Sequence, residues 1–177
     1  MKDPIDHVRG LRARGFTLIE ILCVVVIVGI ASAIIIPQIS SHDDFRCAAA
    51  ARALMADLLY AQNRSIALQT MQYVQFNTAT GTYQVLDAVS PNDVITHPVN
   101  GTPYTVTIGT GSLARVSMST VSFDGNTTIA FDVMGVPYSW NAATGTAPLS
   151  SGKVVFTAGV QTKTVTINAY SGEIKVQ

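Results

Sequence analysis

A long apolar run near the N-terminus constrains this chain more than any other feature. Residues 16–36 read FTLIEILCVVVIVGIASAIII, 21 residues with a single charged side chain, Glu20. As a helix, such a run extends about 32 Å, which matches the roughly 30 Å hydrocarbon core of a bilayer. The run therefore predicts a transmembrane helix, which we place at residues 16–37. A chain with only 12% charged residues agrees with such a segment.

Charge is concentrated in front of this run. Residues 1–15 carry four basic and two acidic side chains, a net charge of +2, which leaves a net charge of −2 for residues 16–177. Basic residues before a membrane span hold that end of the chain in the cytoplasm. A cleavable secretory signal fits less well because its apolar core has about 7 to 15 residues. A lipoprotein signal would use Cys23, but the residue before it, Leu22, is large. A buried core helix is the third alternative.

Glu20 requires an explanation, because a carboxylate in an apolar membrane helix costs on the order of 2 to 3 kcal/mol near the bilayer centre. The apolar run contains no cationic side chain that could pair with it. A cut between Gly15 and Phe16 would create an α-ammonium group about one helical turn from Glu20. The same group could instead meet Glu20 of a neighbouring subunit. Cleavage at this bond would therefore supply the missing charge.

Residues 14–20 (RGFTLIE), followed by the apolar run, resemble the leader and N-terminal helix of type IV pilins and type II secretion pseudopilins. In that family a prepilin peptidase cuts after the glycine and methylates the new N-terminal phenylalanine. The resemblance implies cleavage between Gly15 and Phe16, N-methylation of Phe16, and a role for Glu20 in setting the register between subunits. Residues 1–15 would then be the prepilin leader.

The family also carries helix-weakening residues inside this segment. Gly29 and Pro37 occupy such positions here, and both residue types weaken a helix. The resemblance implies that the stretch between them unwinds when subunits pack into a filament.

Residues 38–71 are expected to form an amphipathic continuation of the helix. The stretch 45–71 is rich in helix formers and follows a polar boundary at 40–44. Large apolar side chains recur on one face at helical spacing, and charged side chains that can face water lie elsewhere. The apolar positions are Leu54, Met55, Leu58, Leu59 and Ile66, and the charged ones are Arg52, Asp57 and Arg64. We predict that the apolar face packs on a sheet rather than on a membrane surface or in a coiled coil.

The region 72–177 is predicted to form antiparallel sheets, because short runs rich in Val, Thr, Ile, Tyr and Phe alternate with Gly, Pro and Asn. Thr80-Gly81 predicts a hairpin turn between strands near 74–76 and 83–85. A surface loop is predicted at 87–103, and Ser171-Gly172 predicts the last turn. The other predicted strands are 104–108, 115–123, 128–133, 153–157, 163–168 and 173–176. The predicted fold class is α+β, with a long N-terminal helix packed on antiparallel β-sheets.

The order of these segments resembles the GspH/FimT branch of the minor pseudopilins, in which a long helix is followed by β-sheets and a closing strand after a glycine turn. The segments that carry the resemblance are 58–77 (LLYAQNRSIALQTMQYVQFN), 131–138 (FDVMGVPY), 153–158 (KVVFTA), 163–168 (KTVTIN) and 171–176 (SGEIKV). The resemblance implies a pilin-like fold in which residues 72–177 form a periplasmic or extracellular β-sheet domain.

No group of residues in the sequence predicts catalysis, a metal or a cofactor. Ser112 lacks the surroundings of a nucleophile elbow. Residues 124–126 (DGN) resemble the start of a calcium loop, but glycine stands at the twelfth position, where an acidic ligand belongs. No pair of histidines has the spacing of zinc ligands; they are His7, His42 and His97. We expect a protein that is not an enzyme and has no small-molecule substrate.

The two cysteines are not expected to form a disulfide. Cys23 and Cys47 are 24 residues apart, and in a mostly helical chain that separation is about 36 Å, too far for a disulfide. Cys23 is expected to fill apolar space in the membrane, and Cys47 to be buried or to contact a partner.

Nucleic acid is the alternative partner that the resemblance raises, because some FimT-like minor pilins bind DNA during natural transformation. Residues 72–177 carry four basic and five acidic side chains, and this net charge of −1 suits a polyanion poorly. The DNA-binding members are thought to use an Arg-rich C-terminal tail, whereas this chain ends in EIKVQ. The charge therefore argues against nucleic acid.

These features together predict a structural subunit of the bacterial inner membrane, with a cytoplasmic N-terminus and a periplasmic C-terminal domain. The resemblance implies cleavage by prepilin peptidase and assembly with other pilins or pseudopilins. The filament would be a type II secretion pseudopilus, which serves protein secretion, or a type IV pilus, with this chain as a minor component. The alternatives are a FimT-like minor pilin that binds DNA and an uncleaved envelope protein that only resembles a pilin.

Overall fold

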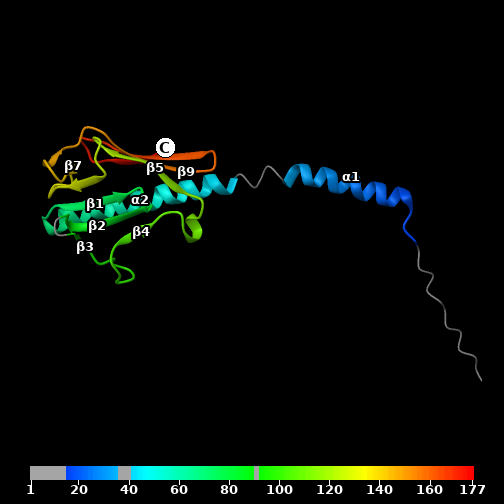
Figure 1. Cartoon of the computed structure of the whole chain (residues 1–177), viewed down its shortest axis with the longest axis horizontal. Coiled ribbons are helices and arrows are strands. Elements are labelled where there is room, and N and C mark those ends of the chain that lie inside the picture. Colours follow the sequence, from blue (N-terminus) through cyan, green and yellow to red (C-terminus); the bar gives the residue numbers. More distant parts are fainter. Residues whose placement is uncertain (1–14, 36–40, 90–91) are drawn as a thin grey trace, which may run out of the picture. The chain divides into compact units, whose positions relative to one another are not determined.

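The computed structural model describes residues 15–35, 41–89 and 92–177. The chain divides into two compact units, Met1–Ile39 and Ser40–Gln177. The described part of the first unit contains one helix, α1 (Leu18–Ile35), and all the strands lie in the second unit (Figure 1). Among the helices of these described ranges, none combines the length and the apolar character that a membrane span requires. The transmembrane helix predicted at 16–37 is thus not shown.

The second unit packs a long helix, α2 (Ser41–Leu68), against two antiparallel sheets. The first sheet has the strand order β3-β2-β1-β6-β7-β8, with β4 also paired to β2, and the second has the order β11-β10-β9-β5. The strands of the first sheet are β1 (Gln72–Asn77), β2 (Thr82–Ala88), β3 (Asp93–Val94), β4 (Thr105–Thr107), β6 (Thr128–Phe131), β7 (Pro137–Asn141) and β8 (Gly145–Pro148). Those of the second sheet are β5 (Ser117–Phe123), β9 (Gly152–Ala158), β10 (Gln161–Ile167) and β11 (Ile174–Val176).

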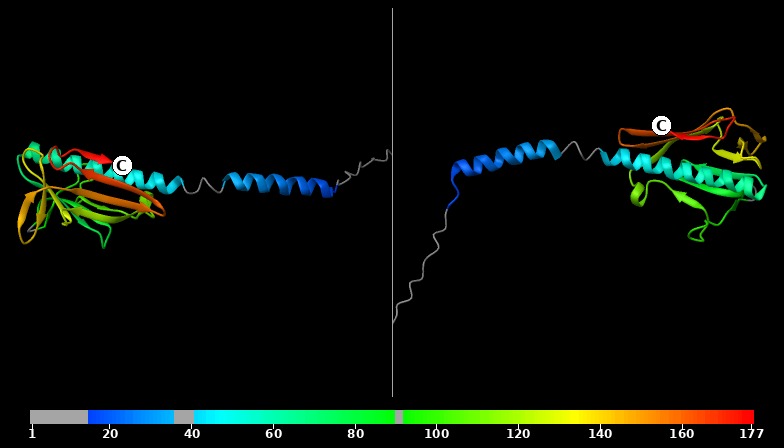
Figure 2. Two further views of the ribbon diagram at one scale, coloured as in Figure 1. Left: turned by 90° about the horizontal axis from the view of Figure 1, so that it is seen from above. Right: turned by 180° about the vertical axis from the view of Figure 1, so that it is seen from behind.

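Helix α2 contacts both sheets, β1 and β6 in the first and β9, β10 and β11 in the second. Figure 2 shows α2 running beside the strands of this unit. The predicted α+β class, a helix packed on antiparallel sheets, is confirmed.

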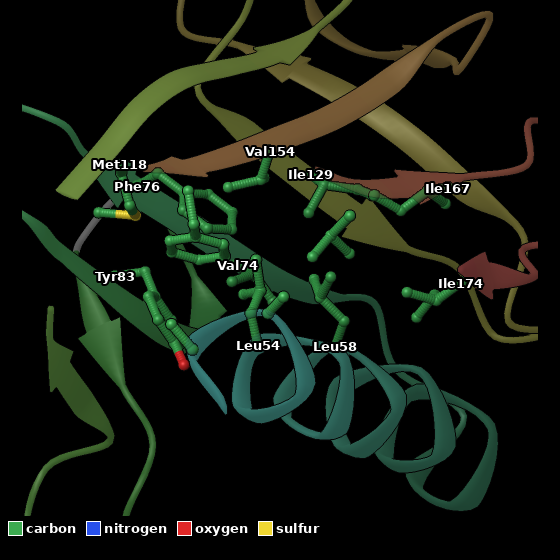
Figure 3. Packing of buried hydrophobic residues seen from close by; sticks show 14 of the residues in the cluster. Leu54, Leu58, Val74, Phe76, Tyr83, Met118, Ile129, Val154, Ile167 and Ile174 are labelled. Atoms are coloured by element: carbon green, nitrogen blue, oxygen red, sulfur yellow. The ribbon is translucent and has the colours of Figure 1, made fainter. Parts of the chain in front are cut away.

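One hydrophobic core joins α2 to both sheets. Leu54 and Leu58 of α2 lie among side chains from the first sheet, such as Val74, and from the second, such as Val154 (Figure 3). Small side chains share the buried face of α2 with the leucines, so the helix backbone can approach the strands closely. The small buried residues are Cys47, Ala50, Ala51, Ala61 and Ser65.

The predicted apolar face of α2 is confirmed at its centre and wrong at its end. Leu54 and Leu58 are fully buried, whereas Ile66 is 44% exposed and the neighbouring Ser65 is buried in its place. Asp57, which was predicted to be able to face water, is half-buried and accepts hydrogen bonds from two tyrosine hydroxyls. The prediction was based on the spacing of large apolar side chains. Where the helix packs closely on the sheets, small side chains are favoured instead.

Most predicted strands are confirmed, including the hairpin of β1 and β2 around Thr80-Gly81. Three strands were missed. They are β3, inside the predicted loop, and β7 and β8, where Pro137 and the turn-rich stretch 141–145 suggest a loop. Proline is nevertheless tolerated as the first residue of a strand. The loop predicted at 87–103 is partly wrong, because it contains β3 and the buried side chain of Ile95.

Cys47 was predicted to be buried or to contact a partner, and it is fully buried. Its thiol lies 3.7 Å from the carbonyl oxygen of Gln161. Burial raises the pKa of the Cys47 thiol, and the charges of Asp44 and Asp43 raise it further. A thiol in this position stays protonated and unreactive at neutral pH.

Candidate processing and assembly site

The bond predicted to be cleaved lies in exposed, non-helical chain directly before α1. Gly15, Phe16 and Thr17 have no regular secondary structure, and all three are exposed. The side chain of Phe16 is 77% exposed. A protease needs an accessible segment that is not held in a helix, and the Gly15–Phe16 bond meets both conditions.

Helix α1 begins with a capping box formed by Thr17 and Glu20. The backbone N–H of Glu20 donates to Thr17 Oγ1 at 3.3 Å, and the backbone N–H of Thr17 donates to Glu20 Oε2 at 3.4 Å. The backbone N–H of Ile21 also donates to the carbonyl oxygen of Thr17, at 3.2 Å. These reciprocal bonds satisfy N–H groups that have no partner within a helix. The sequence TLIE therefore fixes where the helix starts.

The box gives Glu20 a role that the sequence interpretation did not include. The carboxylate folds back over the first turn and places its negative charge at the positive end of the helix dipole. The sequence itself indicates this capping box. A Thr that is followed three residues later by Glu, just before an apolar run, is typical of a helix N-terminus. Thr17 is thus the functional residue that was missed.

The geometry of the box brings Glu20 close to the predicted new N-terminus. Glu20 Oε2 already contacts the backbone nitrogen of Thr17, and the nitrogen of Phe16 is one residue earlier in the chain. Cleavage after Gly15 would turn that nitrogen into a charged amine. The contact of Glu20 Oε2 with Thr17 thus lies one residue from the nitrogen that cleavage would free.

Apart from Glu20 in its first turn, the surface of α1 from Leu18 to Ile30 is apolar in every direction. Its large apolar side chains between Leu18 and Ile30 are all at least half exposed. Successive positions on a helix point about 100° apart, so such a run covers the whole circumference. A helix of this kind requires apolar surroundings, either lipid or other protein.

Gly29 lies inside α1, which continues through it to Ile35. Near it, Ser32 Oγ donates to the carbonyl oxygen of Val28 at 2.7 Å, a bond that often bends helices. Pro37 lies outside the described residues. The structure thus brings Gly15, Phe16 and Glu20 together at one end of α1 and leaves Gly29 apart from them.

Residues 11–36 match the family model described as Prokaryotic N-terminal methylation motif. The chain carries a pilin-type methylation motif. Such a motif marks the substrates of prepilin peptidase and supports a type IV pilin-like protein, anchored in the membrane and assembled into filaments with other pilins. No curated protein and no solved structure matches the chain.

The pilin-type motif contains each residue of the predicted processing site. The matched range spans Gly15, Phe16 and Glu20, and it also includes Thr17 and Gly29. The match ends at residue 36, so Pro37 and the whole second unit lie beyond it.

In the second unit, five of the seven basic residues of 41–177 contact carboxylates. Arg115 lies 3.2 Å from Asp43, which anchors the start of α2 to the chain before β5. The other pairs are Arg46 with Asp43, Arg64 with Asp87, Lys163 with Asp44 and Lys175 with Glu173. A polyanion needs clustered, available positive charge, and these ion pairs do not favour the DNA-binding alternative.

The remaining residues considered for chemistry have structural contacts. Asp124, where a calcium loop was considered, accepts hydrogen bonds from the backbone N–H groups of Ser150 and Ser151, both at 2.8 Å. His97 Nδ1 accepts a hydrogen bond from the backbone N–H of Val99. The centroid of its ring lies 4.3 Å from the centroid of the Tyr104 ring. Ser112 and His42 are exposed. His7 lies outside the described residues.

A half-buried carboxylate, Asp57, lies between α2 and the first sheet and joins a cluster of tyrosines. Asp57 Oδ2 accepts a hydrogen bond from the hydroxyl of Tyr83 at 2.5 Å, and Asp57 Oδ1 accepts one from Tyr104 at 2.9 Å. Both tyrosines are buried, and Tyr60 stacks on Tyr104 with 5.5 Å between ring centroids. The cluster connects α2 to β2 and to the start of β4.

The stability of the protein is expected to fall as the pH rises above about 10. Burial, and then the charge of Asp57 and its hydrogen bond, raise the pKa of Tyr83 and of Tyr104 above their usual range. The folded protein keeps these protons at a pH where the unfolded chain loses them, so increasing pH favours unfolding.

Denaturant unfolding at several pH values between about 8 and 11 measures this dependence. The Tyr83→Phe variant cannot lose the proton and should show a shallower decline of stability with pH. An equal slope in the variant and the unmodified protein would contradict this expectation.

Proposed function

We propose that this chain is a minor pseudopilin of the GspH/FimT type. Prepilin peptidase cuts it between Gly15 and Phe16 and methylates the new amine of Phe16. The match of residues 11–36 to the methylation motif carries the proposal. The exposed bond in front of a capped helix supports it. The mature subunit serves a type II secretion pseudopilus or a type IV pilus.

The proposed arrangement assigns one role to each part of the chain. Residues 1–15 are the cytoplasmic leader and residues 16–37 cross the inner membrane. Residues 38–71 continue as an amphipathic helix, and residues 72–177 form the β-sheet domain in the periplasm or outside the cell. The basic leader, the apolar run of 16–36 and the apolar circumference of α1 support this order.

Assembly then depends on a charge pair between subunits. The carboxylate of Glu20 receives the amine of Phe16 from a neighbouring subunit as α1 moves from lipid into a bundle of similar helices. An unpaired carboxylate would be costly in either apolar environment, so only the correct register neutralises it. Gly29 and Pro37 mark the stretch that unwinds during this step.

Replacing Glu20 by Ala is expected to leave cleavage and membrane insertion intact and to reduce the protein in sheared filaments by roughly tenfold or more. The reason is that the variant cannot pair with the amine of its neighbour. Immunoblots of the sheared and membrane fractions, normalised to the total, measure the loss.

Two further variants separate the charge of Glu20 from its capping role. Glu20→Gln keeps an acceptor for the N–H of Thr17 but removes the charge, whereas Thr17→Ala breaks the capping box and keeps the charge. Glu20→Gln should be excluded from filaments and Thr17→Ala should be incorporated. Normal incorporation of Glu20→Gln would refute the charge pair.

A further inference from the structure

The first sheet has one face turned toward α2 and one turned away, which we call the outer face. On β1, Val74 and Phe76 belong to the core. Because side chains alternate along a strand, Tyr73 and Gln75 lie on the outer face. The same alternation puts Tyr83 and Val85 of β2 in the core and Gln84 on the outer face.

Strand pairing aligns the outer-face residues in two adjacent rows that cross the sheet. The first row is Leu86, Tyr73, Ala130, Tyr138 and Pro148. Leu86 and Ala130 are fully buried, so the accessible members of this row are Tyr73, Tyr138 and Pro148. The second row is Thr105, Gln84, Gln75, Thr128, Trp140 and Thr146, of which Thr128 is buried. Gln84 Nε2 donates to Thr105 Oγ1 at 3.0 Å, so neighbours within a row do share the face.

Neither row contains a charged residue. The outer surface of the second sheet does contain charge. One row there aligns Ser122, Lys153, Thr166 and Lys175. The two rows of the first sheet instead combine three half-buried aromatic rings, Tyr73, Tyr138 and Trp140, with amides and hydroxyls. A face of this composition suits a ligand that is polar, uncharged and partly apolar.

A hollow of about 640 Å³ adjoins the second row at the β1–β2 hairpin. Its lining includes Gln75, Asn77, Thr82, Gln84 and Thr127, and it contains no charged residue. Within the described chain, the amide of Gln75 makes no side-chain hydrogen bond, so its donors and its acceptor remain available to a ligand.

A sugar ring matches these groups because pyranoses have an apolar C–H face and a rim of hydroxyl groups. The face packs on an aromatic ring, and the hydroxyls pair with amide groups that both donate and accept. Tyr73 and Tyr138 are separated by two strand spacings, roughly 9.5 Å, and Trp140 lies roughly 7 Å further along β7. Several rings of an extended chain can therefore be contacted at once.

We propose that the outer face of the first sheet binds an uncharged, extended glycan. Its rings stack on Tyr138 and Trp140, and its hydroxyls bond to Gln75 and Gln84. The absence of charge from both rows disfavours an ionic polymer, because neither row would replace the solvation of its charges. This surface is independent of the processing site, so the inference does not depend on the assembly role.

The full chain in a detergent without a sugar headgroup provides a direct test. Trp140 is the only tryptophan, so its fluorescence reports on this face alone. Titration with cellohexaose should shift the emission, and hydroxyethylcellulose in a native gel should retard the protein. Carboxymethylcellulose, which has the same backbone but is anionic, should retard it less.

Matched variants locate the binding surface. Gln75→Ala keeps the tryptophan and should weaken cellohexaose binding roughly tenfold, and Trp140→Ala should abolish the retardation. Tyr170→Ala removes a tyrosine that is 95% exposed in the turn before β11 and should change neither result. Circular dichroism of each variant verifies folding. An unchanged emission with cellohexaose, stronger retardation by the anionic polymer, or an equal loss in Tyr170→Ala would each overturn the proposal.

Discussion

Replacing Asp57 by Ala is expected to lower the free energy of unfolding by about 3 kcal/mol. The carboxylate accepts hydrogen bonds from Tyr83 at 2.5 Å and from Tyr104 at 2.9 Å. Both tyrosines are at most 3% exposed, so the variant leaves two hydroxyls with little access to water and no acceptor. Denaturant unfolding followed by the fluorescence of Trp140 measures the loss.

Arg52→Ala is the matched control, because Arg52 is an exposed residue of the same helix. Its substitution should change stability by less than about 0.5 kcal/mol. Removing the hydroxyl of Tyr83 as well should make the two losses non-additive, since both substitutions break the same bond. If Asp57→Ala were as stable as Arg52→Ala, the cluster would not contribute to the fold.

Gly172→Ala is expected to cost a similar amount, about 3 kcal/mol. Gly172 has φ +65, and a Cβ there would lie 2.5 Å from Gln62 Nε2 and 2.9 Å from the carbonyl oxygen of Gly135. Gln62 Nε2 donates to that carbonyl at 2.8 Å and so ties α2 to the turn before β7. The added methyl group therefore imposes backbone strain and also displaces this hydrogen bond.

Gly145→Ala separates these two effects. Gly145 has φ +75, but a Cβ there would meet nothing within 4 Å. Its substitution should cost only the conformational part, about 1 kcal/mol. Equal losses in the two variants, measured by the same unfolding experiment, would show that the contact with Gln62 does not matter.

Local patterns were sufficient to predict the elements whose signals lie close together in the chain. The helical spacing of Leu54 and Leu58 located the centre of α2, and Thr80-Gly81 located the first hairpin. The capping box of Thr17 and Glu20 was equally readable, because the two residues are three positions apart.

Features that depend on strand register could not be predicted in this way. Asp57 meets Tyr104 across 47 positions, and only the packing of α2 on the sheet brings them together. The two outer-face rows draw their residues from strands β1, β2, β4, β6, β7 and β8, and they align only once the pairing is known. The small buried side chains of α2 were not predicted for a related reason. Alanine favours a helix wherever it stands, so its presence alone does not show which face of the helix packs on the sheet.

Mass spectrometry of the N-terminus tests the central claim most directly, that the chain is processed between Gly15 and Phe16. The protein would be extracted from membranes of cells grown with and without a co-expressed prepilin peptidase. The account predicts a peptide that begins with methylated Phe16 when the peptidase is present, and an N-terminus upstream of Gly15 when it is absent. An N-terminus that stays upstream of Gly15 in the presence of the peptidase would contradict the account.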